Sequence, residues 1–130
     1  MAFKATLNFE GKEYDVLYCK YSLKRDIDSK GRPASDVYGG IIHIDVESTS
    51  DVTILDKMAN GFKATSGSIV FKKSDEESKM KELSWENGYI IGYDEEIDVV
   101  GSKPMHTSFV VSAKKISMDA AQVEQAWPEE

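Results

Sequence analysis

Hydrophobic and polar residues alternate along most of the chain, which is the pattern of strands that bury one face. The first alternating segment covers residues 3–9, and a turn at Gly11-Lys12 leads it into a second over residues 14–23, so the two predict a hairpin. Further strands, each bounded by Gly, Ser, Asp or Pro, are predicted over residues 41–47, 68–73, 83–93 and 108–116. Strand is therefore the dominant element.

One segment breaks the alternation and predicts a helix of about three turns over residues 51–60. Ser50 can cap its first turn, Asp51 suits the positive end, and Gly61 is placed to end it in the left-handed conformation. The face expected to pack on the strands consists of Val52, Leu55 and Ala59. The expected fold is mainly β: a compact β-barrel with one short α-helix, about residues 51–60, packed at its side, in a single domain over residues 1–130.

Composition agrees with one soluble globular domain. The chain has 130 residues, 41% of them hydrophobic and 30% charged. No apolar run approaches the roughly 20 residues that a membrane helix needs. The N-terminal residues alternate from the start and lack a basic segment followed by an apolar one, so no signal peptide is predicted.

The net charge and the cysteine content argue against nucleic-acid binding and against sites built from several cysteines. A net charge of −7 would repel a phosphate backbone, and the basic pairs are scattered, so nucleic-acid binding is not expected. Cys19 is the only cysteine, which excludes an internal disulfide and a cysteine-based zinc site. Its apolar neighbours favour a buried structural thiol over a nucleophile, and the usage fits the cytoplasm.

Few residues in the sequence suggest a catalytic or metal-binding site. Asp94, Glu95, Glu96 and Asp98 could be paired carboxylates, but no Gly-interrupted calcium loop is present, and solvated acidic loops are the better interpretation. His43 and His106 have no metal spacing. We therefore predict no enzyme and no catalytic, cofactor or metal site; a small hydrolase using the acidic residues is a minor alternative.

A second alternative is a small-ligand-binding β-barrel of lipocalin type, whose interior must stay empty enough for an apolar ligand. Large residues expected to point inward argue for a filled barrel instead: Phe9, Tyr18, Phe71, Trp85 and Phe109. Gly39-Gly40 marks a turn or bulge at the start of the third strand. Trp127 is equally compatible with an anchor on the barrel and with an intersubunit contact.

A long loop, residues 25–40, stands directly before the strand over residues 41–47. Taken alone, it is most simply a mobile hairpin without a partner. Four segments, however, carry a resemblance in their order and spacing: "FKATLNFEGKEYDVLYCKYSLKRDIDSKGRPASDVYGGIIHIDVEST", "GSIVFKK", "KELSWENGYIIGY" and "GSKPMHTSFVVSAKKISM". They resemble the tube protein of type VI secretion, the Hcp family, in its TssD-type branch.

The resemblance implies a ring of six barrels that stacks into the inner tube of the secretion system and holds small effector proteins in its lumen. It implies as partners the sheath, baseplate and spike proteins, but no nucleic acid, no membrane insertion and no cofactor. The protein would reside in the bacterial cytoplasm before firing and leave without a signal peptide. In the family the loop after the second strand meets the adjacent ring, and the corresponding residues here are Arg25, Asp26, Ile27, Asp28, Lys30, Arg32, Pro33 and Tyr38.

Overall fold

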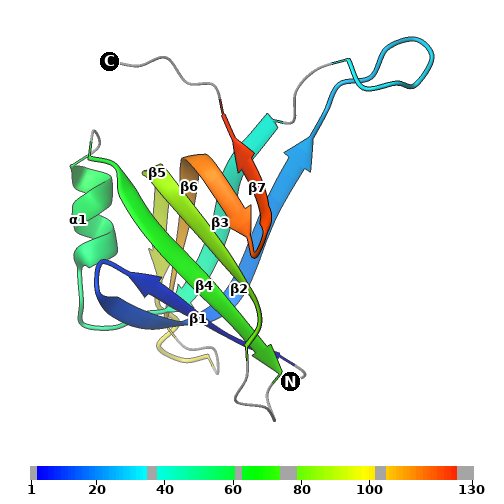
Figure 1. Ribbon diagram of the computed structural model, residues 1–130. Helices are drawn as coiled ribbons and strands as arrows, with labels where there is room; N and C mark the ends of the chain where they lie inside the picture. The colour runs from blue at the N-terminus through cyan, green and yellow to red at the C-terminus, as the bar shows by residue number, and fades with distance from the viewer. Residues whose placement is uncertain (1–2, 35–37, 61–62, 74–78, 102–104, 126–130) are drawn as a thin grey trace.

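The computed structural model describes residues 3–34, 38–60, 63–73, 79–101 and 105–125. Within these residues the chain forms seven strands and one helix (Figure 1). In chain order they are β1 (Phe3–Phe9), β2 (Lys12–Lys24), β3 (Tyr38–Glu47), α1 (Thr53–Ala59), β4 (Thr65–Lys73), β5 (Lys79–Glu96), β6 (His106–Met118) and β7 (Ala121–Glu124). No helix in the described part of the chain is long and apolar enough to cross a membrane.

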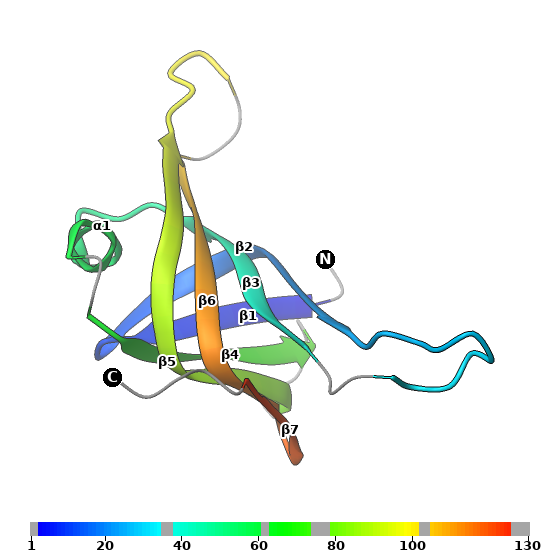
Figure 2. The ribbon, with the colours of Figure 1, turned by 90° about the horizontal axis from the view of Figure 1, so that it is seen from above.

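Six of the strands close into an antiparallel barrel. Their order is β3-β2-β1-β4-β5-β6, and β3 pairs with β6 to complete the circle. Figure 2 shows the barrel from above, with α1 at its side. The predicted fold class, a mainly β barrel with one short helix, is confirmed, and all six predicted strands are present.

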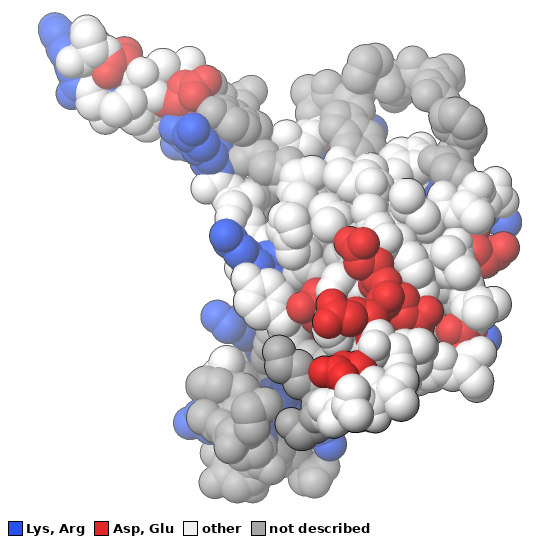
Figure 3. Space-filling model, turned by 180° about the vertical axis from the view of Figure 1, so that it is seen from behind, with Lys and Arg blue, Asp and Glu red and all other residues white. Residues whose placement is uncertain are grey.

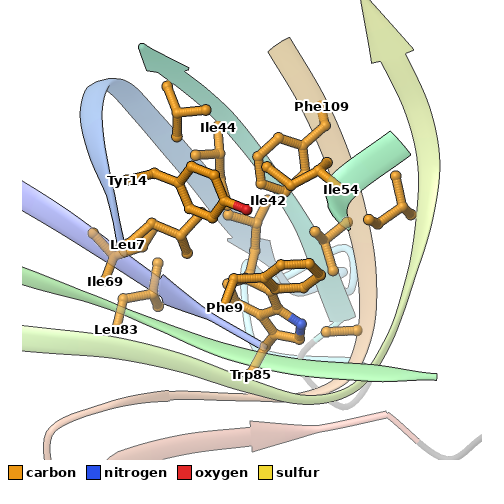
Figure 4. Close-up of a cluster of buried hydrophobic side chains, with 14 of the residues drawn as sticks. Leu7, Phe9, Tyr14, Ile42, Ile44, Ile54, Ile69, Leu83, Trp85 and Phe109 are labelled. Carbon is orange, nitrogen blue, oxygen red and sulfur yellow. The ribbon is translucent and has the colours of Figure 1, made fainter. Parts of the chain in front are cut away.

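The hydrophobic residues of the alternating strands point into the barrel and fill it, because residues paired across antiparallel strands lie on the same face of the sheet. One row of partners runs through β2, β1, β4 and β5, and its four side chains are buried: Tyr14, Leu7, Ile69 and Leu83. Phe9 lies beside two further buried rings, with centroids 6.0 Å from Trp85 and 6.5 Å from Phe109 (Figure 4). The interior of the barrel is therefore packed with large side chains.

Trp85 occupies a niche that two glycines make possible. A Cβ added to Gly67 would lie 2.5 Å from Cη2 of the indole, and one added to Gly88 would lie 2.5 Å from its Cδ1. The indole Nε1 donates to Thr65 Oγ1 at 3.3 Å, and this hydroxyl donates to the Gly88 carbonyl at 2.8 Å. The ring is thus held by packing and by a satisfied polar end.

Of the five residues predicted to fill the interior, Phe9, Trp85 and Phe109 are buried and Phe71 is half-buried, but the prediction for Tyr18 is wrong. Tyr18 is 52% exposed. The β2–β3 register shifts between Val16 and Tyr18, and such a bulge exchanges the inward and outward positions that follow it. Cys19 and Tyr21 pack against the core instead.

The helix exists, but its predicted face and cap are wrong. Ile54 is its buried residue and Met58 packs against the core, whereas Val52 is 65% and Leu55 43% exposed. Val52 holds the N-cap position with no side-chain bond, so Ser50 does not cap the helix. Ala59, the third residue of the predicted face, is also exposed, and Gly61 lies outside the described residues.

Hydrogen bonds and an ion pair of Asp51 connect the start of the helix segment to β2. Its carboxylate accepts hydrogen bonds from the Tyr14 hydroxyl at 2.8 Å and from the Thr53 amide and hydroxyl at 3.0 and 2.7 Å. Lys12 Nζ lies 3.2 Å away. These contacts, the Thr53 hydroxyl first and the Tyr14 hydroxyl next, hold the pKa of Asp51 well below its usual value of 3.8. Burial, followed by the bond to Asp51, raises the pKa of Tyr14 to about 12.

This arrangement predicts a specific acid sensitivity. Because the pKa of Asp51 is lowered by folding, its contribution to stability is complete above pH 3.8 and declines as the pH falls from there toward the folded-state pKa. We expect Asp51→Asn to be less stable than the wild type at pH 7, and the difference to shrink below pH 3.8. Urea unfolding at a series of pH values from neutral to acidic measures this, with the exposed Asp94→Asn as control. An equal difference at every pH would contradict the assignment.

Strand β7 was not predicted, and it shares one side of β6 with β3. β3 pairs with the first part of β6, from His106 to Ser112, and β7 pairs with Lys115 to Met118. Gly40 lies where the two meet: its φ is +83°, and an added Cβ would lie 2.6 Å from the Ala113 carbonyl oxygen. The predicted bulge at Gly39-Gly40 is confirmed by the register shift in β2–β3 at this point.

Candidate functional site

The connection between β2 and β3 stands away from the barrel. Its described part, residues 25–34, is here named the projecting hairpin, and it extends beyond the end of the barrel at which β2 ends and β3 begins (Figure 1, upper right). The view from above shows it reaching away from the other elements (Figure 2). Residues 35–37 lie outside the described part of the chain.

Asp28 orders the tip of this hairpin. Its Oδ1 accepts hydrogen bonds from the amides of Lys30 at 2.9 Å and Arg32 at 3.0 Å, and its Oδ2 binds Arg32 Nε at 3.0 Å. The backbone closes the same turn, with Gly31 N bonded to Asp28 O at 3.0 Å and Asp28 N to Arg32 O at 2.8 Å. Gly31 has a φ of +82°, which a turn tolerates best with glycine. The Arg32 and Lys30 amides lower the pKa of Asp28.

A second set of contacts joins the two arms. Ile27 and Pro33 form an antiparallel bridge, and Ala34 N donates to Asp26 O at 2.8 Å. Ile27 is nevertheless 69% exposed. The hairpin thus has hydrogen bonds of its own, while the side chain of Ile27 faces solvent.

The structure brings together most of the residues predicted to form an interface. Seven of them lie on the projecting hairpin, whereas Tyr38 is the first residue of β3 and pairs with Lys24. The seven are Arg25, Asp26, Ile27, Asp28, Lys30, Arg32 and Pro33.

Charge distinguishes the hairpin from the rest of the chain. The hairpin, residues 25–34, holds three cations and two anions, a local charge of +1 in a protein whose net charge is −7. The back of the barrel is acidic (Figure 3). There the registers place Asp45 and Asp94 beside Ser108, and Glu47 and Glu96 beside His106.

The predicted acidic loop is in part a strand, because β5 continues through Glu96 and includes Asp94 and Glu95. Asp98 lies beyond it and accepts hydrogen bonds from the amides of Val100 and Gly101. In the described part of the chain no group of three or more His, Cys, Asp or Glu residues is placed to hold a metal ion. Cys19 is half-buried, and burial raises the pKa of its thiol to about 11, which disfavours the nucleophilic thiolate. Trp127 lies outside the described residues.

Sequence reasoning missed a groove on the outside of the barrel. It has a volume of about 530 Å³, and residues of β1, β2, β3 and β4 line it together with Ser48 and Thr49. Its charged residues are Lys4, Glu13, Asp15, Glu47 and Lys72. No single segment supplies more than two of them, so no local motif could have revealed it.

Comparison with known proteins identifies the family. The family model described as "Hemolysin coregulated protein Hcp (TssD)" matches residues 1–128. The chain belongs to the Hcp family. No curated protein sequence matches it.

Solved structures agree with this assignment. Hcp1 from Flavobacterium johnsoniae shares 35% sequence identity and a TM-score of 0.87 with this Hcp chain, and the match covers 94% of this chain and 99% of that one. Hcp1 from Salmonella typhimurium has a TM-score of 0.74 at 11% identity, with 95% and 92% covered. The secreted protein Hcp3 from Pseudomonas aeruginosa has a TM-score of 0.65 at 8% identity, with 98% and 100% covered. The last two show the fold alone.

Membership confirms the resemblance seen in the sequence. Hcp proteins are structural, non-enzymatic components of the type VI secretion system, so the expectation of no enzymatic activity holds at the level of the family. The family implies hexameric rings, and its members are secreted by that system.

Proposed function

We propose that this Hcp protein is a subunit of the inner tube of the type VI secretion system. Six copies form a ring, rings stack into a tube, and a contractile sheath expels the tube. Family membership supports this role. The observation that carries it further is the projecting hairpin, because an ordered segment that leaves the barrel and exposes an isoleucine is suited to contact another subunit.

The hairpin is the proposed contact between adjacent rings. Its internal bonds fix its shape before contact, which lowers the conformational entropy that binding must overcome. Pro33 restricts the backbone further. Tyr38, at the base, is part of the same proposed contact.

The lipocalin-type alternative is disfavoured by the interior. A barrel that binds an apolar ligand needs a cavity on its axis. Here the inward positions hold Phe9, Trp85 and Phe109, each 1% exposed, together with a row of buried aliphatic residues.

Within the proposed role, the partners are other copies of the chain, the sheath, baseplate and spike proteins, and small effector proteins in the ring lumen. The protein is made in the bacterial cytoplasm, and the secretion system delivers it to the medium or a target cell. Its secretion by the system is the property that its family supports.

The ring is tested by the mass of the purified protein. A cyclic assembly repeats one contact until it closes, so light scattering at micromolar concentration should give about 87 kDa, six times the 14.5 kDa of the chain. Negative-stain images should show rings with an open centre. A monodisperse species of 14.5 kDa across moderate salt concentrations would contradict the proposed function.

A further inference from the structure

The groove on the outside of the barrel crosses four neighbouring strands. In the sheet these strands follow one another in the order β3-β2-β1-β4, and each of them contributes residues to the groove. The charged side chains are separated by sign, because the two lysines come from β1 and β4 and the three carboxylates come from β2 and β3. One side of the groove is therefore cationic and the other side is anionic.

Each side contains a pair of like charges. Lys4 and Lys72 are partners in the β1–β4 register. Asp15 and Glu47 each lie one residue beyond the partner pair of β2 and β3 that is nearest the groove, which places them opposite each other. Lys4, Asp15 and Glu47 are exposed and Lys72 is half-buried. Like charges directly opposite each other destabilise a sheet, so both pairs are unfavourable in the free chain.

The chain itself does not neutralise either pair. Within the described part of the chain, none of the five charged groups of the groove makes an ion pair. Lys4 and Asp15 occupy diagonal positions, because Asp15 pairs with Thr6, two residues after Lys4. Their Cβ atoms are therefore about 7–8 Å apart. A ligand with one charge of each sign would neutralise both sides of the groove at once.

The spacing of the two sides sets the length of such a ligand. Adjacent strands lie about 4.8 Å apart, so β4 and β3 are separated by about 14 Å across the groove. An extended peptide spans about 3.3–3.6 Å per residue, so a peptide of about two to four residues places its ammonium and carboxylate groups at the two sides. A free amino acid is too short. The groove volume of about 530 Å³ lies within the range of about 300–1,000 Å³ that is usual for small-molecule sites.

Hydroxyl groups between the two sides can bind a peptide backbone. The groove includes Thr6, Ser48 and Thr49. The Thr6 hydroxyl makes no hydrogen bond within the described residues. Ser48 Oγ shares one with Thr107 Oγ1 at 2.8 Å, and Thr49 Oγ1 accepts one from the Asp51 amide at 3.1 Å. Because a hydroxyl can donate one hydrogen bond and accept two, all three keep capacity for a ligand.

We infer that the groove binds a short peptide of about two to four residues with free ends. Its carboxylate lies between Lys4 and Lys72, and its ammonium group lies between Asp15 and Glu47. This binding activity is additional to the tube function and does not depend on it. A ligand with only negative charge is repelled by the carboxylates and a ligand with only positive charge by the lysines, so the groove discriminates against both.

Blocking one end of a peptide at a time tests the inference. The probes are tri-alanine with free ends, N-acetyl tri-alanine and tri-alanine amide, and saturation-transfer difference NMR with the purified protein gives their dissociation constants. We expect each blocked peptide to bind about threefold to fivefold more weakly than the free one, since each loses an exposed ion pair. Equal affinity for the three peptides, or no saturable binding of free tri-alanine, would overturn the inference.

Variants of the two sides assign the ends of the peptide. Replacement of Lys4 and Lys72 by methionine should abolish the difference between tri-alanine and its amide while keeping the difference from the acetylated form. Asp15→Asn combined with Glu47→Gln should give the reverse pattern. Glu124→Gln, on β7 outside the groove, should bind all three peptides as the wild type does. If either double variant changes both differences equally, the assignment of the two ends is wrong and the inference fails.

Stability and oligomeric state provide independent measurements on the same samples. Each double variant removes two like charges that face each other, so its melting temperature should be unchanged or higher. A lower melting temperature would show that these charges stabilise the barrel, against the premise of the inference. A protein that forms hexamers in light scattering but does not bind tri-alanine contradicts this inference alone, whereas a monomer that binds the peptide contradicts the proposed function alone.

Discussion

Replacing Gly88 by alanine is expected to destabilise the barrel by about 1–3 kcal/mol, the usual cost of forcing extra atoms into a packed core. The new Cβ would lie 2.5 Å from Cδ1 of Trp85 and 2.7 Å from Cγ1 of Val111. Trp85 cannot move away easily, because Gly67 meets it on another side and Thr65 holds its Nε1. Urea unfolding of the purified variant measures the loss.

Gly92 offers a matched control in the same strand. Its added Cβ would meet no atom closer than 3.5 Å, from Val110, and its φ is not positive. Gly92→Ala should therefore be neutral or stabilising by up to about 1 kcal/mol, through the reduced freedom of the unfolded chain. If the two variants are equally stable, the niche around Trp85 is looser than the distances indicate.

Replacing Ile27 by aspartate and Arg32 by glutamate together is expected to abolish stacking and secretion while leaving the ring intact. Ile27 is 69% exposed, so its replacement removes little from the core of the subunit. If the contact between rings excludes water, burying the new carboxylate would make the free energy of ring association several kcal/mol less favourable. The glutamate introduced in place of Arg32 would also repel Asp28, where the wild type has an ion pair at 3.0 Å, and so loosen the tip.

Three measurements check this prediction. Light scattering should still give the hexamer, the melting temperature should change by only a few degrees, and secretion and killing of neighbouring cells should be lost. Val52→Asp makes the same apolar-to-acidic change at a residue that is 65% exposed on the start of the helix segment, and it should secrete normally. Normal secretion by the double variant would leave the hairpin without a role in stacking. Dissociation into monomers would assign it to the contact within the ring.

The strands could be predicted because alternation is a local property, and it held wherever the register ran without interruption. It failed at Tyr18, because a bulge depends on the partner strand and leaves no clear trace in β2 itself. It also missed β7, whose four residues include only Val123 as a half-buried apolar position.

The helix shows a different limit. Asp51 has the composition of a residue at a helix start, but its carboxylate serves Tyr14 and Lys12 on another strand as well as Thr53. In this two-turn segment Ile54 rather than Leu55 is buried. Tertiary contacts therefore outweighed local periodicity.

The candidate site was predictable only in part. Asp28, Gly31 and Pro33 are turn-forming residues in suitable positions, so an ordered hairpin could have been inferred from them. The groove could not, because its charged residues converge from four strands whose registers the sequence does not state.

The pairing of β3 with β6 sets the order in which the chain can fold. Neighbouring pairs such as β1–β2 and β5–β6 join residues close in sequence, whereas β3–β6 joins Ile44 to Phe109 across most of the second half of the chain. Contacts between distant residues form late, since their loop-closure entropy must be overcome first. Until then both strands present open edges that can pair with other chains. Productive assembly thus depends on intramolecular closure being faster than encounters between unfinished barrels.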